Sequence, residues 1–278
     1  MKTAIITGAD GTMGQELVKN LAIEGYYIIM ACHHIEKGER ICQKLRHELQ
    51  WKQIQAFELD LSSLENVCTF CTKIQNTIDH IDILLNNAGV LPSHAKISSN
   101  GYELTSAVNF LGHFLLTEKL FPLYIEGTKI VNMVSLTYQF GNINKDILLP
   151  ISKKYNRFVC YSDSKLAVYY ATLYWAEKWK NNHIFVNCTD PGIVNTNIIR
   201  MDNKIIDCLC DIFFRPIIRS PRKGADSMIF LATNTIGGQH SGQLFKNRKI
   251  VNVKSKIKNN PLQKKLINNA LDIVRHYL

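Results

Sequence analysis

Short apolar runs of the β type alternate with longer helical runs along most of this chain. The runs with strand character are 3–7, 27–31, 54–58, 81–85, 129–134, 184–188 and 243–245. They are apolar almost throughout, as is typical of strands that are buried on both faces of a sheet. About seven strands separated by helices predict a single doubly wound α/β domain over 1–278, with a parallel sheet of the Rossmann type and helices on both faces.

The first strand runs into a glycine-rich turn. Its sequence is Thr7-Gly8-Ala9-Asp10-Gly11-Thr12-Met13-Gly14, and a helix follows. Glycines in such a turn let a pyrophosphate approach the helix N-terminus, where free N–H groups and the helix dipole attract anions. A strand before the turn and a helix after it are the context in which this pattern predicts dinucleotide binding.

The residues after the second strand bear on the choice of cofactor. Ala31-Cys32-His33-His34 stands where a nucleotide ribose would lie in this fold, and the first acid comes only at Glu36. An acid at this place would bind the 2′-hydroxyl of NAD and repel the extra phosphate of NADP. His33, with Lys37 and Arg40 nearby, therefore favours NADP(H). NAD(H) remains the alternative, because a neutral histidine binds phosphate less well than arginine does.

The third and fourth strands end in residues suited to a flat ligand. Asp60 could accept a hydrogen bond from an adenine amine, or it could cap the helix that starts at Ser62 or Ser63. The small residues of Asn86-Asn87-Ala88-Gly89 leave room for close packing of backbone against the ligand.

A tyrosine and a lysine stand four residues apart in the run 161–180, which reads as one long helix. At this spacing Tyr161 and Lys165 project from one helical face. A free phenol titrates near pH ~10, so it exchanges protons at neutral pH only if a nearby cation stabilises its phenolate. Lys165 can be that cation, although the pair alone is also typical of an ordinary amphipathic helix.

Together these residues resemble the short-chain dehydrogenase/reductase family. The elements that carry the resemblance follow the family's order along nearly the whole chain: the glycine turn, Asp60, residues 86–89, Asn109, Ser135, Tyr161 with Lys165, and Pro191-Gly192-Ile193-Val194-Asn195-Thr196. The chain is most similar to the retinol-dehydrogenase-like branch. That likeness lies in Ala31-Cys32, Glu36-Lys37-Gly38, Asp60-Leu61-Ser62-Ser63-Leu64, Tyr155-Asn156-Arg157-Phe158 and the long gap from Ser135 to Tyr161.

The resemblance implies an NAD(P)-dependent oxidoreductase acting on a carbonyl or alcohol group. Tyr161 would exchange the proton, and Lys165 would lower the pKa of Tyr161 and hold the nicotinamide ribose. Ser135 would bind the substrate oxygen. Asn109 would hold a water of the family's proton relay, or it could be a buried amide that braces a helix.

The resemblance also implies a set of cofactor contacts. They are Gly8, Asp10, Thr12, Met13, Gly14, His33, Asp60, Leu61, Asn87, Ala88, Gly89, Tyr161, Lys165, Pro191, Gly192, Val194 and Thr196. Thr12 departs from the family, because it stands at the family's second glycine. A β-branched residue there would narrow the space for a pyrophosphate, although its hydroxyl could donate to a phosphate oxygen. This departure is the main support for a rival function, a non-catalytic nucleotide-binding sensor or scaffold.

Two apolar segments bear on substrate and partners. The insertion at about 195–220 is rich in isoleucine, leucine and phenylalanine, which predicts a lid over an apolar substrate, or packing on the core or on a lipid surface. The amphipathic run after Pro261 predicts docking on its own domain, with weak membrane-surface association as the alternative. The small residues Ser164, Ala167 and Ala171 would allow a helix-to-helix contact in a homodimer.

Charge and cysteine content exclude several other classes of protein. The net charge of +10 is concentrated in the tail at about 246–278, which contains nine Lys/Arg and a single acid, Asp272. Zinc-finger spacing and basic–aromatic interleaving are both missing from the sequence, so nucleic acid is not a predicted partner. Eight cysteines without an export signal predict reduced thiols and a cytoplasmic location. The Cys68–Cys71 pair lacks a second pair at zinc-site spacing, so no metal is predicted.

Overall fold

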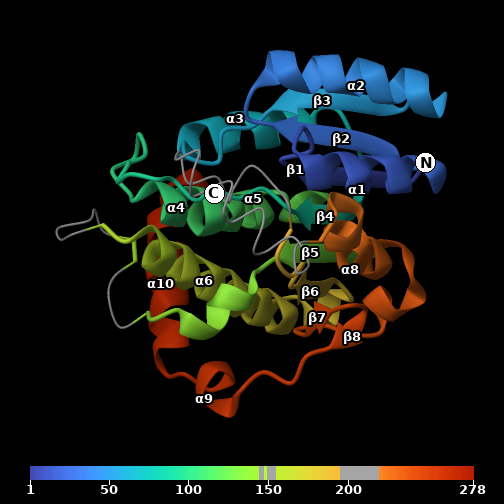
Figure 1. Ribbon diagram of the computed structural model, residues 1–278. Helices are drawn as coiled ribbons and strands as arrows, with labels where there is room; N and C mark the ends of the chain where they lie inside the picture. Colours follow the sequence, from blue (N-terminus) through green and yellow to red (C-terminus); the bar gives the residue numbers. More distant parts are fainter. Residues whose placement is uncertain (144–146, 149–154, 195–218) are drawn as a thin grey trace.

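The structure is a computed structural model that describes residues 1–143, 147–148, 155–194 and 219–278. Within these residues, eight strands form one sheet in the order β3-β2-β1-β4-β5-β6-β7-β8 (Figure 1). The strands are β1 (Thr3–Thr7), β2 (Tyr27–Cys32), β3 (Ile54–Glu58), β4 (Ile81–Asn86), β5 (Tyr124–Met133), β6 (Phe185–Thr189), β7 (Leu244–Lys246) and β8 (Lys249–Ile250). This sheet confirms the predicted doubly wound fold.

The last strand is where the sheet differs from the prediction. β7 and β8 pair antiparallel, whereas every other neighbouring pair is parallel. Asn247 and Arg248 join them with φ of 52° and 61°, as in the tight two-residue turns that match the twist of a hairpin. A two-residue strand is too short to show a periodic pattern, so the sequence did not predict it.

Helices cover both faces of the sheet. α1, α2 and α8 share one apolar cluster with Ala4 and Ile6, while α3, α5 and α6 share the other with Ile5, because successive strand residues point to opposite faces. The helices are α1 (Thr12–Ile23), α2 (Ile35–Leu49), α3 (Leu64–Gln75), α4 (Leu104–Ser106), the π-helix η1 (Ala107–Gly112), α5 (His113–Lys119), α6 (Arg157–Lys178), α8 (Pro221–Thr233), α9 (Ser255–Lys258) and α10 (Leu262–Val274). Short 3-10 helices lie at η2 (Phe121–Leu123), η3 (Leu136–Phe140), η4 (Lys180–Asn182), η6 (Thr235–Gly238) and η7 (Arg275–Tyr277).

The strand order reverses beside β1, and this places the site. β2 lies on one side of β1 and β4 on the other, so the connections on the two sides run in opposite directions. In open α/β sheets a ligand binds in the crevice at such a switch point, outside the carboxyl ends of the strands. The residues that follow β1, β2, β4, β5 and β6 therefore belong to one candidate site.

The C-terminal helix α10 docks on its own domain, as predicted. Leu266, Ile267, Ala270 and Val274 are buried in the same cluster as α6, and Figure 1 shows α10 alongside α6. The apolar face of α10 is thus occupied by the chain itself. Among the described residues, helices that combine the length and the apolar character needed to cross a bilayer are absent.

The small residues of α6 that are predicted for a homodimer contact are buried inside the domain. Ser164, Ala167 and Ala171 are at most 1% exposed. A homodimer, which stays a prediction, would therefore need another surface.

The docking of α10 yields a prediction for stability. Ile267→Ala is expected to lower the free energy of unfolding by about 2–5 kcal/mol, because it removes buried methyl groups and leaves a cavity. Lys265→Ala, at an exposed position of the same helix, should change it by less than about 0.5 kcal/mol. Urea denaturation of both variants measures this difference. Equal effects would contradict the docking.

Candidate active site

The turn between β1 and α1 has glycine where the backbone requires it. Gly8 has φ of 62°, and a Cβ there would lie 3.1 Å from Ala88. A Cβ on Gly14 would lie 2.2 Å from the Gly8 oxygen, which no side chain can tolerate. Thr12 is exposed at the first position of α1 and does not disturb this packing. Its effect on a pyrophosphate stays a prediction.

The N-terminus of α1 is suited to an anion. Gly11 precedes the helix and offers no side chain to cap it, and the first turn holds no acid. The first N–H groups and the positive end of the dipole are thus available to a phosphate. The Asp10 carboxylate beside this turn is paired with the Lys37 ammonium at 2.7 Å, so the charge of Lys37 is already shared with an acid.

Thr7 at the end of β1 fixes the turn that follows β4. Its hydroxyl oxygen accepts hydrogen bonds from the backbone N–H groups of Asn87 at 2.9 Å and Ala88 at 3.0 Å. The Asn87 amide donates in turn to the Thr7 carbonyl at 2.9 Å. These bonds hold two predicted cofactor contacts against the glycine turn.

His113, which the sequence interpretation missed, also contacts Thr7 and helps to hold it in place. Its Nε2 lies 3.0 Å from the Thr7 hydroxyl oxygen. Burial, together with the charge of Lys165, lowers the pKa of His113 to about 3. The ring is therefore neutral and links β1 to the start of α5.

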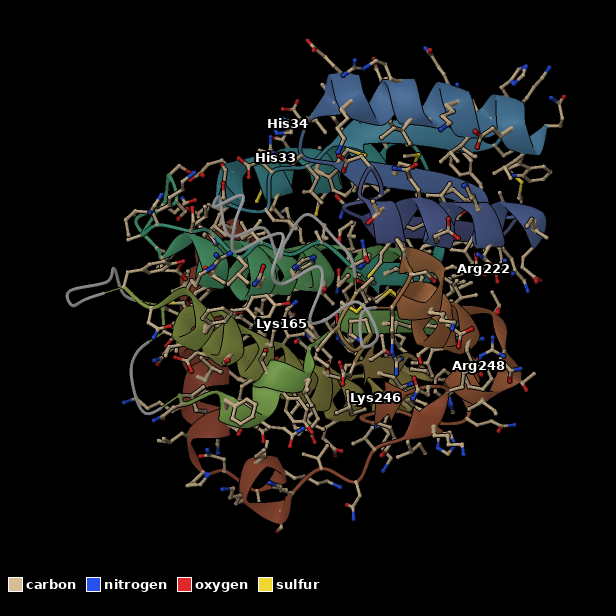
Figure 2. All side chains as sticks on the ribbon, viewed as in Figure 1. His33, His34, Lys165, Arg222, Lys246 and Arg248 are labelled. Atoms are coloured by element: carbon tan, nitrogen blue, oxygen red, sulfur yellow. The ribbon has the colours of Figure 1, made fainter. Side chains whose placement is uncertain are left out.

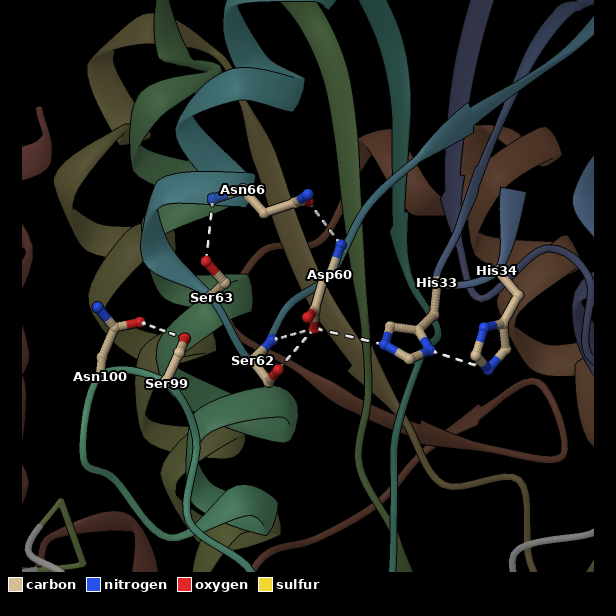
Figure 3. Close-up of polar contacts among 8 residues, drawn as sticks. All are labelled: His33, His34, Asp60, Ser62, Ser63, Asn66, Ser99 and Asn100. Carbon is tan, nitrogen blue, oxygen red and sulfur yellow. Dashed lines mark hydrogen bonds and ion pairs between the residues drawn. The ribbon is translucent and has the colours of Figure 1, made fainter. Parts of the chain in front are cut away.

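At the predicted ribose position, His33 lies between an acid and a second histidine (Figure 3). Its Nε2 is 3.7 Å from the Asp60 carboxylate, and its Nδ1 is 3.2 Å from Nε2 of His34. Asp60 accepts hydrogen bonds from the N–H and the hydroxyl of Ser62 at 2.8 and 2.7 Å. Ser63, rather than Asp60, caps α3, so the Asp60 carboxylate shapes the turn where the nucleotide would lie.

Three predicted contacts have side chains in the core. Met13, Leu61 and Val194 are at most 9% exposed. Direct contact of these three residues with a cofactor stays a prediction.

Helix α6 presents Tyr161 and Lys165 to the crevice. The Asn156 side chain caps the helix by accepting hydrogen bonds from the N–H groups of Phe158 and Val159. Lys165 Nζ donates to the Met133 carbonyl at 2.9 Å and lies 5.5 Å from the Tyr161 ring centroid. Burial lowers the pKa of Lys165 to about 8.

Tyr161 and Ser135 lie close enough for their side chains to interact. Burial raises the pKa of Tyr161 to about 12, the Ser135 side chain opposes that rise, and the Asp190 carboxylate adds to it. The lowering predicted from Lys165 is not seen in this geometry. The physical reason is that the Lys165 ammonium points to the Met133 carbonyl.

Asn109 lies in η1, a π-helix, and local π-helical turns often mark functional sites. Its Oδ1 accepts from the Val90 N–H at 2.8 Å, and its Nδ2 donates to the Val90 carbonyl and to the Ser164 hydroxyl, both at 3.1 Å. The side chain thus braces η1 against the neighbouring loop and α6. A Cβ on Gly89 would lie 3.4 Å from Asn109 Oδ1 and 3.5 Å from Lys165 Nζ. The proton-relay role of Asn109 stays a prediction.

The turn after β6 closes the site. Gly192 has φ of 74°, and a Cβ there would lie 2.9 Å from Arg219. Asp190, the residue before Pro191, is buried beside this turn and was missed from the sequence. Thr196 and residues 195–218 of the predicted lid lie outside the described residues.

Two cysteines of the described residues have raised thiol pKa values, which disfavours the reactive thiolate. Cys68 and Cys71 lie in α3, and burial raises the pKa of each thiol. Among the described residues, groups of three or more metal-ligating side chains are absent.

The arrangement fits a nicotinamide dinucleotide and proton transfer beside it. The glycine turn and the uncapped α1 can take the pyrophosphate, and the His33 region lies where the ribose would be. Tyr161 and Ser135 offer two adjacent hydroxyl groups to one oxygen atom of a substrate. This combination is the chemistry needed at a carbonyl or alcohol group.

Comparisons with known proteins agree with this geometry. The model of a family described as short chain dehydrogenase matches residues 2–205. Human retinol dehydrogenase 13 is 32% identical over 250 residues, which cover 88% of this chain and 76% of that protein. Human retinol dehydrogenase 14 is 32% identical over 261 residues, with 88% and 77% covered.

Solved structures share the fold. A protein of Mycobacterium paratuberculosis without known function has a TM-score of 0.79 and 23% identity, with 99% of this chain and 94% of that chain covered. The active-site complex of Pseudomonas aeruginosa RhlG with NADP has a TM-score of 0.70 and 21% identity, with 88% and 94% covered.

Proposed function

The chain belongs to the short-chain dehydrogenase/reductase family, in its retinol-dehydrogenase-like branch, and from this we propose that it transfers a hydride between NADP(H) and an apolar alcohol or carbonyl compound, with Tyr161 carrying the proton. As a member of this family it is an NAD(P)-dependent oxidoreductase that acts on CH–OH or C=O groups. The observation that supports the role of Tyr161 is that the Ser135 side chain acts on its phenol by lowering its pKa, beside the buried Lys165.

The proposed mechanism assigns one task to each side chain. The nicotinamide, when bound, gives or takes the hydride. Tyr161 donates a proton to the carbonyl oxygen in reduction and removes it from the hydroxyl in oxidation. Ser135 donates a hydrogen bond to the same oxygen and stabilises its developing charge. Lys165 would stabilise the phenolate that Tyr161 becomes in reduction if its ammonium turned from the Met133 carbonyl toward Tyr161, and Asn109 holds η1 in place beside it.

The proposed substrate is a long apolar primary alcohol or its aldehyde. Retinol is the first compound to test, because the two human relatives are retinol dehydrogenases by name. The apolar composition of 195–220 also favours an apolar substrate.

The proposed cofactor preference is for NADP(H) over NAD(H). At the end of β2 the chain offers His33 and His34, and the Asp60 carboxylate is engaged by Ser62. The acid beside His33 is Asp60, which lies 3.7 Å from His33 Nε2 and follows β3 rather than β2. A protonated imidazole can donate to the 2′-phosphate of NADP, although less strongly than a guanidinium.

His33→Arg tests this preference. The variant is expected to bind NADP about tenfold more tightly, since a guanidinium can form a bidentate contact with the phosphate, and to leave NAD binding nearly unchanged. Calorimetric titration with both nucleotides measures the two Kd values. His47→Arg, an exposed position at the far end of α2, is the matched control. Parallel changes for NADP and NAD would contradict a phosphate contact at His33.

Location and partners complete the proposal. We propose a cytoplasmic protein, in keeping with its unpaired cysteines among the described residues. Of the nine basic residues in the tail, Lys246, Arg248 and Arg275 are paired with acids. The others leave a basic surface that could attract an anionic membrane weakly.

The function is tested by following nicotinamide absorbance with NADPH or NADP and a panel of retinoid, aliphatic and aromatic aldehydes and alcohols. Turnover of apolar members is the expected result. Tight binding of the nucleotide without turnover across the panel would favour the sensor or scaffold alternative instead. That alternative is not favoured at present, because the family match and the complete set Asn109, Ser135, Tyr161 and Lys165 point to an enzyme.

A further inference from the structure

Asp190 ties together two loops of the site. It follows β6, and its carboxylate is buried. One oxygen, Oδ1, accepts hydrogen bonds from the N–H of Leu136 at 3.1 Å and from the N–H of Gly192 at 2.9 Å. Leu136 is next to Ser135, and Gly192 belongs to the turn that closes the site. A single carboxylate oxygen therefore fixes the substrate-binding serine relative to that turn.

The other oxygen of Asp190 has a cation of its own. Lys246 Nζ lies 2.9 Å from Asp190 Oδ2. The pairing of β6 with β7 creates this contact, because Thr189 stands opposite Phe245 and the Asp190 N–H donates to the Phe245 carbonyl at 2.9 Å. Lys246 lies on β7, on the same side of the molecule as Arg222 and Arg248 (Figure 2).

The charge of Asp190 acts on Tyr161. The carboxylate raises the pKa of Tyr161, in the same direction as burial does. The groups that face this corner are Ser135 after β5, Lys165 on α6, His113 on α5, which is neutral, and the Asp190–Lys246 pair of β6 and β7. Lys246 is the cation in direct contact with Asp190, so it is placed to offset the field of that carboxylate.

We propose that Asp190 and Lys246 form a positioning pair for the reaction, in which Asp190 holds the Ser135 loop and Lys246 weakens the opposition of the Asp190 charge to proton release by Tyr161. The inference rests on the proposed role of Tyr161. Both residues act through other groups. Asp190 acts through the backbone beside Ser135, and Lys246 acts through Asp190.

The test is the pH profile of kcat/KM for alcohol oxidation, which requires the Tyr161 phenolate. Lys246→Met leaves the carboxylate without its cation and should move the rising limb to higher pH by about 0.5–1 unit. Asp190→Asn keeps an acceptor oxygen for Leu136 and Gly192 but removes the charge, so it should move the limb to lower pH. The double variant should lie between them. Lys246→Arg should restore the wild-type limb.

Two controls separate charge from packing. Lys254→Met removes an exposed charge of the same tail and should leave the limb in place. Near-ultraviolet difference titration of each variant against the same variant carrying Tyr161→Phe reports ionisation of this phenol without turnover. The thermal midpoint of each variant shows that it is folded.

Each outcome decides the matter. The ordered limbs, with Asp190→Asn lowest and Lys246→Met highest, would support the pair. Loss of kcat/KM in all variants with the limb unmoved would show a purely structural role and overturn the inference, while the proposed function would stand. A wild-type limb that does not depend on Tyr161 would overturn both. If Lys246→Met does not fold, the limbs of Asp190→Asn and Lys246→Arg still decide between a charge effect and packing.

Discussion

Tyr161→Phe is expected to lower kcat/KM for carbonyl reduction by about 10²–10⁴-fold, the range typical of losing a general acid. The substitution removes only the hydroxyl and keeps the ring on α6, so the packing of the helix should persist. Affinity for NADP(H) should stay within about threefold of wild type, since no phosphate contact is lost. Steady-state kinetics and nucleotide titration measure the two quantities.

The direction of the pH dependence follows from the raised pKa of Tyr161. Burial places it at about 12, so the phenol keeps its proton throughout the neutral range. Reduction, which needs the proton, should therefore be nearly independent of this group at neutral pH. Oxidation, which needs the phenolate, should rise with pH, and this rise should vanish in Tyr161→Phe.

Tyr174→Phe is the matched control. Tyr174 lies on the same helix, is also partly buried, and contacts Lys178 rather than the crevice. Its substitution should leave kcat/KM close to wild type. Undiminished turnover in Tyr161→Phe would refute the mechanism, and equal losses in both variants would indicate damage to α6 instead.

The first strand could be predicted from the sequence with its exact bounds. The run 3–7 coincides with β1, because an apolar run bounded by turns is the direct consequence of burial on both faces. The run 54–58 coincides with β3, although β3 is the edge strand of the sheet and is only partly buried. β5 begins at Tyr124, earlier than the predicted 129, since its first residues are exposed and lack an apolar pattern.

The predictable part of the site lies at the ends of strands and on one helix. The spacing of Tyr161 and Lys165 needs only the period of a helix, and Ser135 needs only its place after a strand. The direction of the Lys165 ammonium could not be predicted from spacing. It depends on the Met133 carbonyl at the end of β5, and only the packing of α6 on the sheet brings that carbonyl within hydrogen-bond distance.

Asp190, Lys246 and His113 show why the rest was missed. Lys246 reads in the sequence as one charge of a basic tail, and only the register of β6 with β7 places it against Asp190. His113 reads as one residue of an apolar helix, yet it meets Thr7 from 106 positions away. Contacts of this kind depend on tertiary register, which local patterns do not encode. An acid directly before Pro191-Gly192 was the one available signal.

Lys165→Met is the second variant with a large expected effect. It should lower kcat/KM by about 10²–10³-fold, because the buried cation beside Tyr161, which the proposed mechanism uses, is lost while the length of the side chain is kept. The remaining activity should require higher pH. Lys180→Met, an exposed position just beyond α6, should have no such effect. Activity at the wild-type level would show that Lys165 has no part in the proton transfer.

Lys165→Met, which should lower activity, should raise the free energy of unfolding at neutral pH. Because burial lowers the pKa of Lys165 from 10.5 to about 8, the unfolded chain keeps this proton between these pH values and the folded chain releases it. The free energy of unfolding of the wild type should therefore rise relative to Lys165→Met, by up to about 3 kcal/mol, as pH increases through this window. Below it the folded state carries a buried charge, so Lys165→Met should be the more stable protein. Urea denaturation of both proteins at pH values on either side of this window measures the difference. A pH-independent difference would mean that Lys165 is not buried as a charge, and its loss of activity would then need a cause other than electrostatics.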